Sequence, residues 1–194
     1  MNRNDTKQRL VEHTAETISK LGWEQVSIRT LTHDLGLTTG SFYKHFSSKE
    51  ALFDTVAKAM SRNLREEVFP AVQSQMPDHP EHALLAIGKT LLERSLHEAR
   101  QIDFLFFSPW TRSALEDGNH VFPLLELTKT VIEAIVRDRD LDIAPQTLFL
   151  QVWAFLQGFV QLLHQGVIVE DDALMQRTLT TLITPTTSEE RRAR

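Results

Sequence analysis

The chain has 194 residues, a formal net charge of −5 and no cysteine. This length allows one domain, or a small domain joined to a larger one. The lack of cysteine excludes disulfides, thiolate metal sites and cysteine nucleophiles, and it fits a reducing cytoplasm. Residues 1–50 hold seven Lys or Arg against six Asp or Glu, whereas residues 51–194 hold 14 against 20. The acidic balance argues against non-specific DNA coating, but a site-specific module needs only a few cations.

Neither export nor a membrane span is expected. The first nine residues are polar and charged, unlike a signal peptide. The longest apolar stretch, residues 152–160, is interrupted by Gln157 and Gly158 and is far shorter than the roughly 20 residues that cross a bilayer. We therefore expect a soluble, cytoplasmic protein.

Apolar residues recur at three- and four-residue spacing, which predicts an all-α fold of about nine helices. In chain order, a helix over 5–21 ends at Gly22, Ser27 caps a short helix to residue 35, and Gly36 makes a turn into a helix over 38–45. Ser47 and Glu50 have capping-box spacing and start a helix that Pro70 kinks or ends. A connector over 70–80 precedes helices near 81–99, 102–107, 119–139, 145–165 and 171–183, and residues 185–194 form a disordered tail.

Residues 27–46 have the build of a helix-turn-helix. Two short helices must cross at a large angle, and Gly36 supplies the tight turn between them. The apolar contacts come from Leu31, Leu35, Leu37, Phe42 and Phe46. The other face of the second helix is short or cationic, which suits the DNA major groove. The alternative is an ordinary helical hairpin with a solvated polar face.

At these positions the sequence resembles the TetR family of bacterial regulators. The shared pattern is Gly-Leu-Thr at 36–38, Tyr-Lys-His-Phe at 43–46 and Ser-Lys-Glu-Ala-Leu at 48–52. One departure is Thr32, where the family usually has Ala, so its buried hydroxyl needs a backbone acceptor. The resemblance covers about residues 10–52, and the C-terminal part carries no motif as specific.

The resemblance implies a DNA-binding domain over 1–47 that contacts operator DNA through three groups of residues. Base edges or backbone are approached by Thr38, Thr39, Gly40 and Ser41, and phosphates by Tyr43, Lys44 and Lys49, while His45 could do either. The sugar-phosphate strand is reached by Ser27, Arg29 and Thr30.

Residues 48–184 are expected to form an all-helical domain for ligand sensing and dimerisation. The helix over 145–165 is apolar on more than one face, so we place a homodimer contact at Phe155, Gly158, Phe159 and Leu162. The resemblance implies a four-helix bundle made by this helix and the last one of each subunit. The alternative is a central core helix, because apolar periodicity does not distinguish the two kinds of burial.

A small-molecule effector site is expected among the aromatic residues of the second half, as a region only. Its candidate residues are Phe104, Phe107, Trp110, Phe122 and Phe155, with His97, Arg112, His120 and Gln157 as polar anchors. The alternative is that the aromatic residues are simply core.

These features predict a sequence-specific transcriptional regulator, a repressor released from a palindromic operator when a small, largely apolar molecule binds. The alternative is a helical small-molecule-binding module without specific DNA binding. An enzyme is not expected, because no nucleophile elbow, zinc-protease motif, phosphate loop or dinucleotide fingerprint occurs. No cofactor or metal is expected either, since the potential ligands at 78–82 lie in the connector and are better explained as solvated polar residues.

Overall fold

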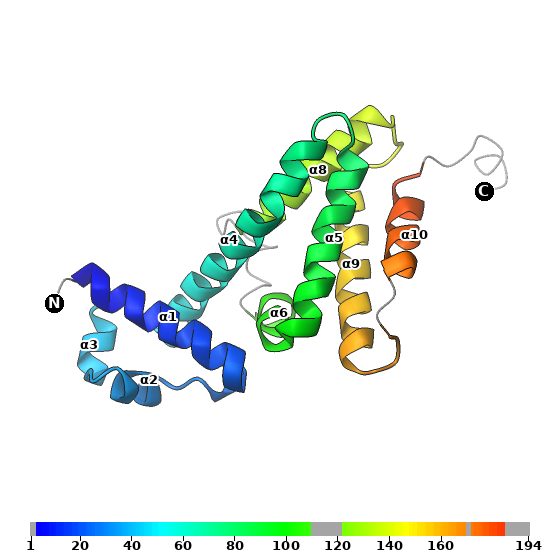
Figure 1. Ribbon diagram of the computed structural model, residues 1–194. Helices are drawn as coiled ribbons and strands as arrows, with labels where there is room; N and C mark the ends of the chain where they lie inside the picture. Colours follow the sequence, from blue (N-terminus) through cyan, green and yellow to red (C-terminus); the bar gives the residue numbers. More distant parts are fainter. Residues whose placement is uncertain (1–2, 110–121, 170–171, 185–194) are drawn as a thin grey trace. The chain divides into compact units, whose positions relative to one another are not determined.

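The computed structural model describes residues 3–109, 122–169 and 172–184 of the chain. Within these ranges the chain forms nine α-helices, one 3-10 turn and no strand, which confirms the predicted all-α class (Figure 1). The elements are α1 (Arg3–Leu21), η1 (Trp23–Gln25), α2 (Ile28–Asp34), α3 (Thr39–Tyr43), α4 (Lys49–Gln75), α5 (Pro80–His97), α6 (Ala99–Phe107), α8 (Pro123–Asp138), α9 (Pro145–His164) and α10 (Asp172–Leu182).

The chain divides into two compact units. Unit 1 comprises Met1–Leu64 and Arg94–Pro123, and unit 2 comprises Arg65–Glu93 and Leu124–Arg194. Unit 1 therefore contains α1 to α3, the first part of α4, the end of α5, and α6.

The core of unit 1 is built on one face of α1. Leu10, Thr14 and Ile18 are fully buried and four residues apart, so they lie one above the other along the helix. The Thr14 hydroxyl donates to the Leu10 carbonyl at 2.7 Å, which satisfies its polar group inside the core. Farther along the chain, the buried rings of Phe53 and Phe104 meet edge to face at 5.5 Å and join α4 to α6.

The start of α4 differs from the sequence prediction by one residue. The cap is Ser48 and not Ser47, because Ser48 Oγ accepts a hydrogen bond from the Ala51 N–H at 3.2 Å. The carboxylate of Glu50 bonds its own backbone N–H and the Ser48 side chain, and these bonds lower the pKa of Glu50. The two-residue spacing of Ser48 and Glu50 therefore replaces the expected capping box.

Pro70 does not end α4, which continues to Gln75. Proline removes one helical N–H, but Leu64, Val68 and Val72 are buried at four-residue spacing on either side of it. Continuous burial along one face holds the helix in register across the proline, whose own ring is exposed. The expected connector over 70–80 is therefore shortened to residues 76–79.

Two other boundaries also differ from the prediction. The helix expected over 81–99 runs from Pro80 to His97, and α6 begins at Ala99 instead of near residue 102. Glu98 breaks the helical path with φ −132° and ψ 44°, so one residue separates α5 from α6. The expected helix start at 119, residue 171 and the tail over 185–194 lie outside the described residues.

Helix α9 has seven buried residues in unit 2 and packs beside α10. Helix α5 also approaches α10 closely at Gly88, because a Cβ built on this glycine would lie 3.0 Å from Leu179 Cδ1 and 3.4 Å from Met175 Sδ of α10. Among the described helices, α9 is the one long and apolar enough to cross a membrane by length and composition. The buried core helix of a globular domain passes the same test.

Candidate nucleic-acid interface

Helix α2 begins at a serine cap, as predicted. Ser27 has extended backbone and its Oγ accepts from the Thr30 N–H at 3.1 Å, while the Ser27 and Thr30 hydroxyl oxygens lie 2.7 Å apart. This bond satisfies one of the N–H groups that a helix start leaves unpaired. It also fixes both hydroxyls on the exposed surface at the entrance to the helix-turn-helix.

The turn between α2 and α3 is closed by Gly36. Its φ of 66° lies in the left-handed region that favours glycine. The Leu37 N–H donates to the Thr32 carbonyl at 2.7 Å, and the Gly36 N–H donates to the His33 carbonyl at 3.0 Å. These two bonds form a Schellman motif, which ends α2 and turns the chain sharply into α3.

The hydroxyl of Thr32 finds the backbone acceptors that the sequence required. Thr32 is 3% exposed, and its Oγ1 contacts the carbonyl oxygens of Ile28 at 2.9 Å and Arg29 at 3.1 Å. The polar group is therefore paired within its own helix. The substitution of threonine at this position leaves the helix-turn-helix intact.

Helix α3 presents a polar outer face over an aromatic base. Thr38 caps the helix, with its Oγ1 accepting from the Ser41 N–H at 3.1 Å. Phe42 is fully buried and its ring contacts those of Tyr43 at 5.3 Å and Phe46 at 5.8 Å. The residues on the outer face are exposed or half-buried, namely Thr38, Thr39, Gly40, Ser41, Tyr43, Lys44 and His45.

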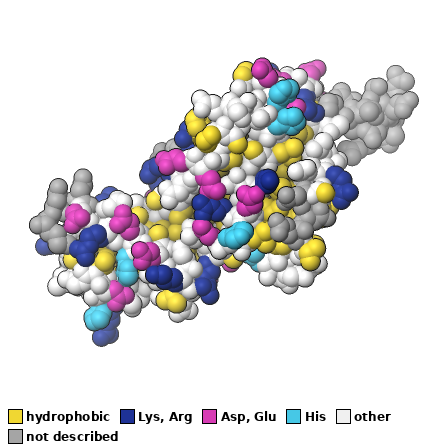
Figure 2. Space-filling view, viewed as in Figure 1, with side chains coloured by type: hydrophobic (Ala, Val, Ile, Leu, Met, Phe, Trp, Pro, Cys, Tyr) yellow, Lys and Arg dark blue, Asp and Glu magenta, His cyan; other side chains and the backbone are white. Residues whose placement is uncertain are grey.

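The cationic side chains around α3 differ in how far they are exposed to solvent. Arg29 on α2 and Lys44 after α3 are exposed, whereas Lys49 is half-buried with its Nζ 5.0 Å from the centre of the Phe53 ring. Figure 2 shows Lys, Arg and His side chains interspersed with Asp and Glu over the N-terminal helices. Any attraction to phosphate therefore depends on where single cations lie and not on net charge.

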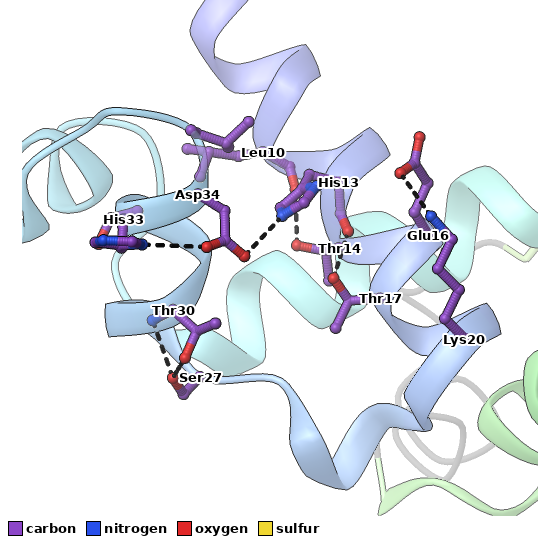
Figure 3. Close-up of polar contacts among 12 residues, drawn as sticks. Leu10, His13, Thr14, Glu16, Thr17, Lys20, Ser27, Thr30, His33 and Asp34 are labelled. Atoms are coloured by element: carbon purple, nitrogen blue, oxygen red, sulfur yellow. Dashed lines mark hydrogen bonds and ion pairs between the residues drawn. The ribbon is translucent and has the colours of Figure 1, made fainter.

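A polar contact that the sequence did not reveal joins α1 to α2 (Figure 3). Asp34, the last residue of α2, contacts His33 Nδ1 at 3.2 Å and His13 Nε2 of α1 at 3.4 Å. These hydrogen bonds, that to His33 first, lower the pKa of Asp34. One residue farther, Arg9 of α1 donates to the Leu35 carbonyl at 3.3 Å. Helix α1 therefore contacts the end of α2 at Asp34 and the start of the turn at Leu35.

The sequence of this region matches a known family. Residues 10–56 match the family model described as "Bacterial regulatory proteins, tetR family". The likeness to the TetR family is shown for this N-terminal segment, which is about a quarter of the chain.

A curated relative is similar to part of the chain. The uncharacterized HTH-type transcriptional regulator YerO of Bacillus subtilis (strain 168) is 35% identical over 49 residues. The match covers 25% of this chain and 17% of that protein, so the sequence likeness is confined to a short segment of both.

Solved structures extend the likeness in fold to the rest of the chain. RolR in complex with resorcinol has a TM-score of 0.74 at 16% identity, covering 98% of this chain and 93% of that one. The multidrug binding protein EbrR complexed with imidazole has a TM-score of 0.62 at 16% identity, covering 94% of this chain and 97% of that one. At such low identity these matches show a shared fold.

The expected effector residues do not gather around one described cavity. Phe104 and Phe122 are buried core residues, whereas His97 and Phe107 are exposed. Phe155 and Gln157 are half-buried on α9. Trp110, Arg112 and His120 lie outside the described residues.

A cavity of about 230 Å³ lies in unit 1 instead, between α4, the end of α5 and α6, and none of the expected effector residues lines it. Sequence patterns mark which residues are buried, but they do not mark where packing leaves a space. Among the described residues no group of three or more His, Asp or Glu could hold a metal ion, and the segment over 78–82 is no exception.

The predicted dimer residues divide between two faces of α9. Phe159 is buried and Phe155 half-buried, whereas Gly158 and Leu162 are exposed. Four exposed residues recur at every fourth position and form an outer row, which consists of Leu150, Ala154, Gly158 and Leu162. Nothing lies within 4 Å of a Cβ built on Gly158, so the middle of this row is open in the protomer.

Proposed function

We propose that the chain is a sequence-specific DNA-binding transcriptional regulator. Residues 1–47 would read operator DNA, and residues 48–184 would sense an effector and dimerise. The observation that carries the proposal is the exposed polar face of α3, held by the glycine turn against a buried aromatic base. A short helix with small polar side chains can enter the major groove closely enough to contact base edges.

The exposures support two kinds of DNA contact. Thr38, Thr39, Gly40 and Ser41 form the start of α3, so we assign them to base edges and the adjoining backbone. The remaining residues surround this edge and we assign them to phosphate and sugar, with His45 open to either role; they are Ser27, Arg29, Thr30, Tyr43, Lys44, His45 and Lys49. Tyr43 is 55% exposed, and its contact with Phe42 holds its ring at the surface.

The outer row of α9 supports a homodimer. Leu150 and Leu162 are 49% and 41% exposed, and between them stand only the small residues Ala154 and Gly158. Small residues let two helix backbones approach closely, and the two leucines would flank such a crossing. A second copy of the chain would therefore bury an apolar row that one protomer leaves in water.

An effector would act by favouring one arrangement of the two DNA-binding heads. RolR holds resorcinol and EbrR holds imidazole, which supports a small organic effector for this chain. Such a ligand shifts the equilibrium only by its difference in affinity for the two arrangements. We propose that its binding releases the protein from the operator, in the cytoplasm, so that the protein acts as a repressor.

The experiment that tests the DNA-binding proposal is selection from a random-sequence duplex library on the immobilised full chain at physiological salt. A two-fold symmetric motif with half-sites about one helical turn, or roughly 34 Å, apart is the expected result. The control is the double variant Lys44→Ala, Tyr43→Ala, which should not enrich the motif. Equal enrichment by both proteins, or none by either, would contradict the proposal; no enrichment would favour a small-molecule-binding module.

A further inference from the structure

Gly40 is a glycine that the fold of α3 does not require. Apart from the adjacent residues and the helix backbone, a Cβ built on it would have within 4 Å, among the described residues, only Thr38 Oγ1, at the ordinary contact distance of 3.8 Å. Gly36, in contrast, has φ 66°, and a Cβ on Gly88 would lie 3.0 Å from Leu179. Since alanine is more favourable than glycine in a helix, α3 gives up stability at Gly40 without a reason inside the protomer.

Gly40 also occupies the outermost point of α3. A helix turns by about 100° per residue, so Gly40 lies about 200° around the helix from Phe42, whose side chain is fully buried. Lys44, four residues later, stands on the same outer face. Thr39 and Ser41 lie about 100° to either side of Gly40. We call this bare position, with Thr39, Ser41 and Lys44 around it, the Gly40 notch.

The Gly40 notch suits one kind of base edge. When α3 lies in the major groove, its outermost point meets the base edges first. A polar edge that faced a bare Cα would lose water without gaining a side-chain partner, which weakens binding. Thymine, in contrast, presents its C5-methyl group in the major groove, and a methyl group gains affinity when it leaves water. The notch therefore favours thymine.

We propose that Gly40 selects thymine at one position of each operator half-site, by receiving the thymine C5-methyl group in the Gly40 notch. This inference rests on the proposed function, because it names a base that the DNA-reading helix requires. The methyl group of the base takes the place that the Cβ of an alanine would take. A methyl group on the protein and a methyl group on the base therefore exclude each other.

The DNA side is tested with the motif that the library selection provides. Each thymine is replaced in turn, in both half-sites, by deoxyuridine, which lacks only the methyl group, and affinity for the full chain is measured by fluorescence anisotropy. One buried methyl group contributes about fourfold in affinity, so one replacement should weaken binding about fourfold per half-site. Deoxyuridine at a thymine outside the motif is the control and should change nothing. A half-site without thymine, or one in which every replacement is neutral, overturns the inference.

The protein side is tested with Gly40→Ala, which adds the methyl group that glycine lacks. This variant should bind the thymine duplex at least tenfold more weakly than the unchanged chain does, and it should prefer uracil at the sensitive position. Its melting temperature, followed by circular dichroism, should equal or exceed that of the unchanged chain, because a Cβ has room in the protomer. The matched control is Thr130→Ala, an exposed change on α8, which should keep the preference for thymine.

The outcomes separate this inference from the proposed function. A Gly40→Ala chain that prefers thymine by the same factor as the unchanged chain shows that the methyl group does not lie in the Gly40 notch. A lowered melting temperature shows that the fold itself requires the glycine. Either result overturns the inference, and so does an enriched motif that is bound equally with uracil, although the proposed function then stands. A selection without any enriched motif overturns both.

Discussion

Lys44 is exposed at the end of α3, where a phosphate strand would pass if α3 lay in the major groove. We expect Lys44→Ala to weaken binding to all DNA sequences alike and to reduce the slope of log affinity against log salt by about one. The slope can be measured by fluorescence anisotropy at salt concentrations from about 50 to about 200 mM.

The matched control for Lys44 is Lys89→Ala on α5, where Lys89 is exposed beside Glu93 in unit 2. This variant should keep the slope of the unchanged protein. A Lys44 variant with an unaltered slope would show that the Lys44 ammonium does not contact phosphate.

The contact between α1 and α2 should lose stability in acid, because it depends on the ionised carboxylate of Asp34. Its pKa is lowered by His33 and His13, so its stabilising effect is complete above the ordinary carboxyl value and is lost as pH falls through the lowered one. Asp34→Asn should lower the urea midpoint at neutral pH by a small amount, and the difference should shrink below about pH 4. Glu133→Gln, an exposed change on α8, is the control. A difference that stays constant with pH would contradict this account.

Single residues were predictable where their role is local. Ser27 as a cap, Gly36 as a turn and the need of Thr32 for an acceptor each follow from the chemistry of that residue and its near neighbours. The contact between His13 and Asp34 spans 21 residues, and nothing in its spacing distinguishes it from other surface pairs. This contact could not be predicted from neighbouring residues in the sequence, because it forms only where α1 and α2 cross.

At the scale of elements, the cap of α4 can be tested directly. Ser48→Ala removes the acceptor of the Ala51 N–H and should lower the free energy of unfolding by about 1 kcal/mol. Ser47→Ala changes the preceding, exposed serine and should have little effect. Urea denaturation followed by circular dichroism measures both. Equal losses would show that neither side chain caps the helix selectively.

The sequence predicted which segments are helical, but it did not predict the residues at which several helices begin and end. Apolar spacing identified every described helix, because it reflects the face that each one buries. Pro70 predicts a kink or an end of the helix, but α4 continues past it because burial of Val68 and Val72 outweighs the one lost hydrogen bond. The break at Glu98 has no glycine or proline to mark it, so the near continuity of α5 and α6 could not be predicted.

At the scale of the whole molecule, the outer row of α9 determines assembly in our proposal. Gly158→Leu fills the open middle of the row and should hold two helices apart, so the variant should be mainly monomeric where the unchanged chain is dimeric. Because no atom lies near that position in the protomer, the helical content should be kept. Sedimentation equilibrium, together with circular dichroism, measures both quantities.

The control for assembly is Thr130→Leu, an exposed threonine on α8. This variant should remain dimeric. A Gly158 variant that also remains dimeric would place the interface elsewhere on the chain.

The functional site was predictable in part, for a physical reason. Residues 27–46 carry a local motif, so the arrangement of α2, the turn and α3 followed from the sequence. The effector region was inferred from its aromatic residues, yet Phe104 and Phe122 proved to be core. Aromatic composition predicts burial, whereas a cavity depends on how distant helices fail to fill the space between them.

The cap of α3 shows how folding and function can favour different residues at one position. The Thr38 oxygen accepts a bond from its own helix, which leaves its proton for an external acceptor such as a phosphate oxygen. Aspartate caps a helix at least as well but has no proton and carries the charge of the phosphate itself. Thr38→Asp should therefore match or exceed the unchanged chain in melting temperature and lose at least tenfold in operator affinity. A screen for melting temperature alone would therefore select this variant, although it would have lost its affinity for the operator.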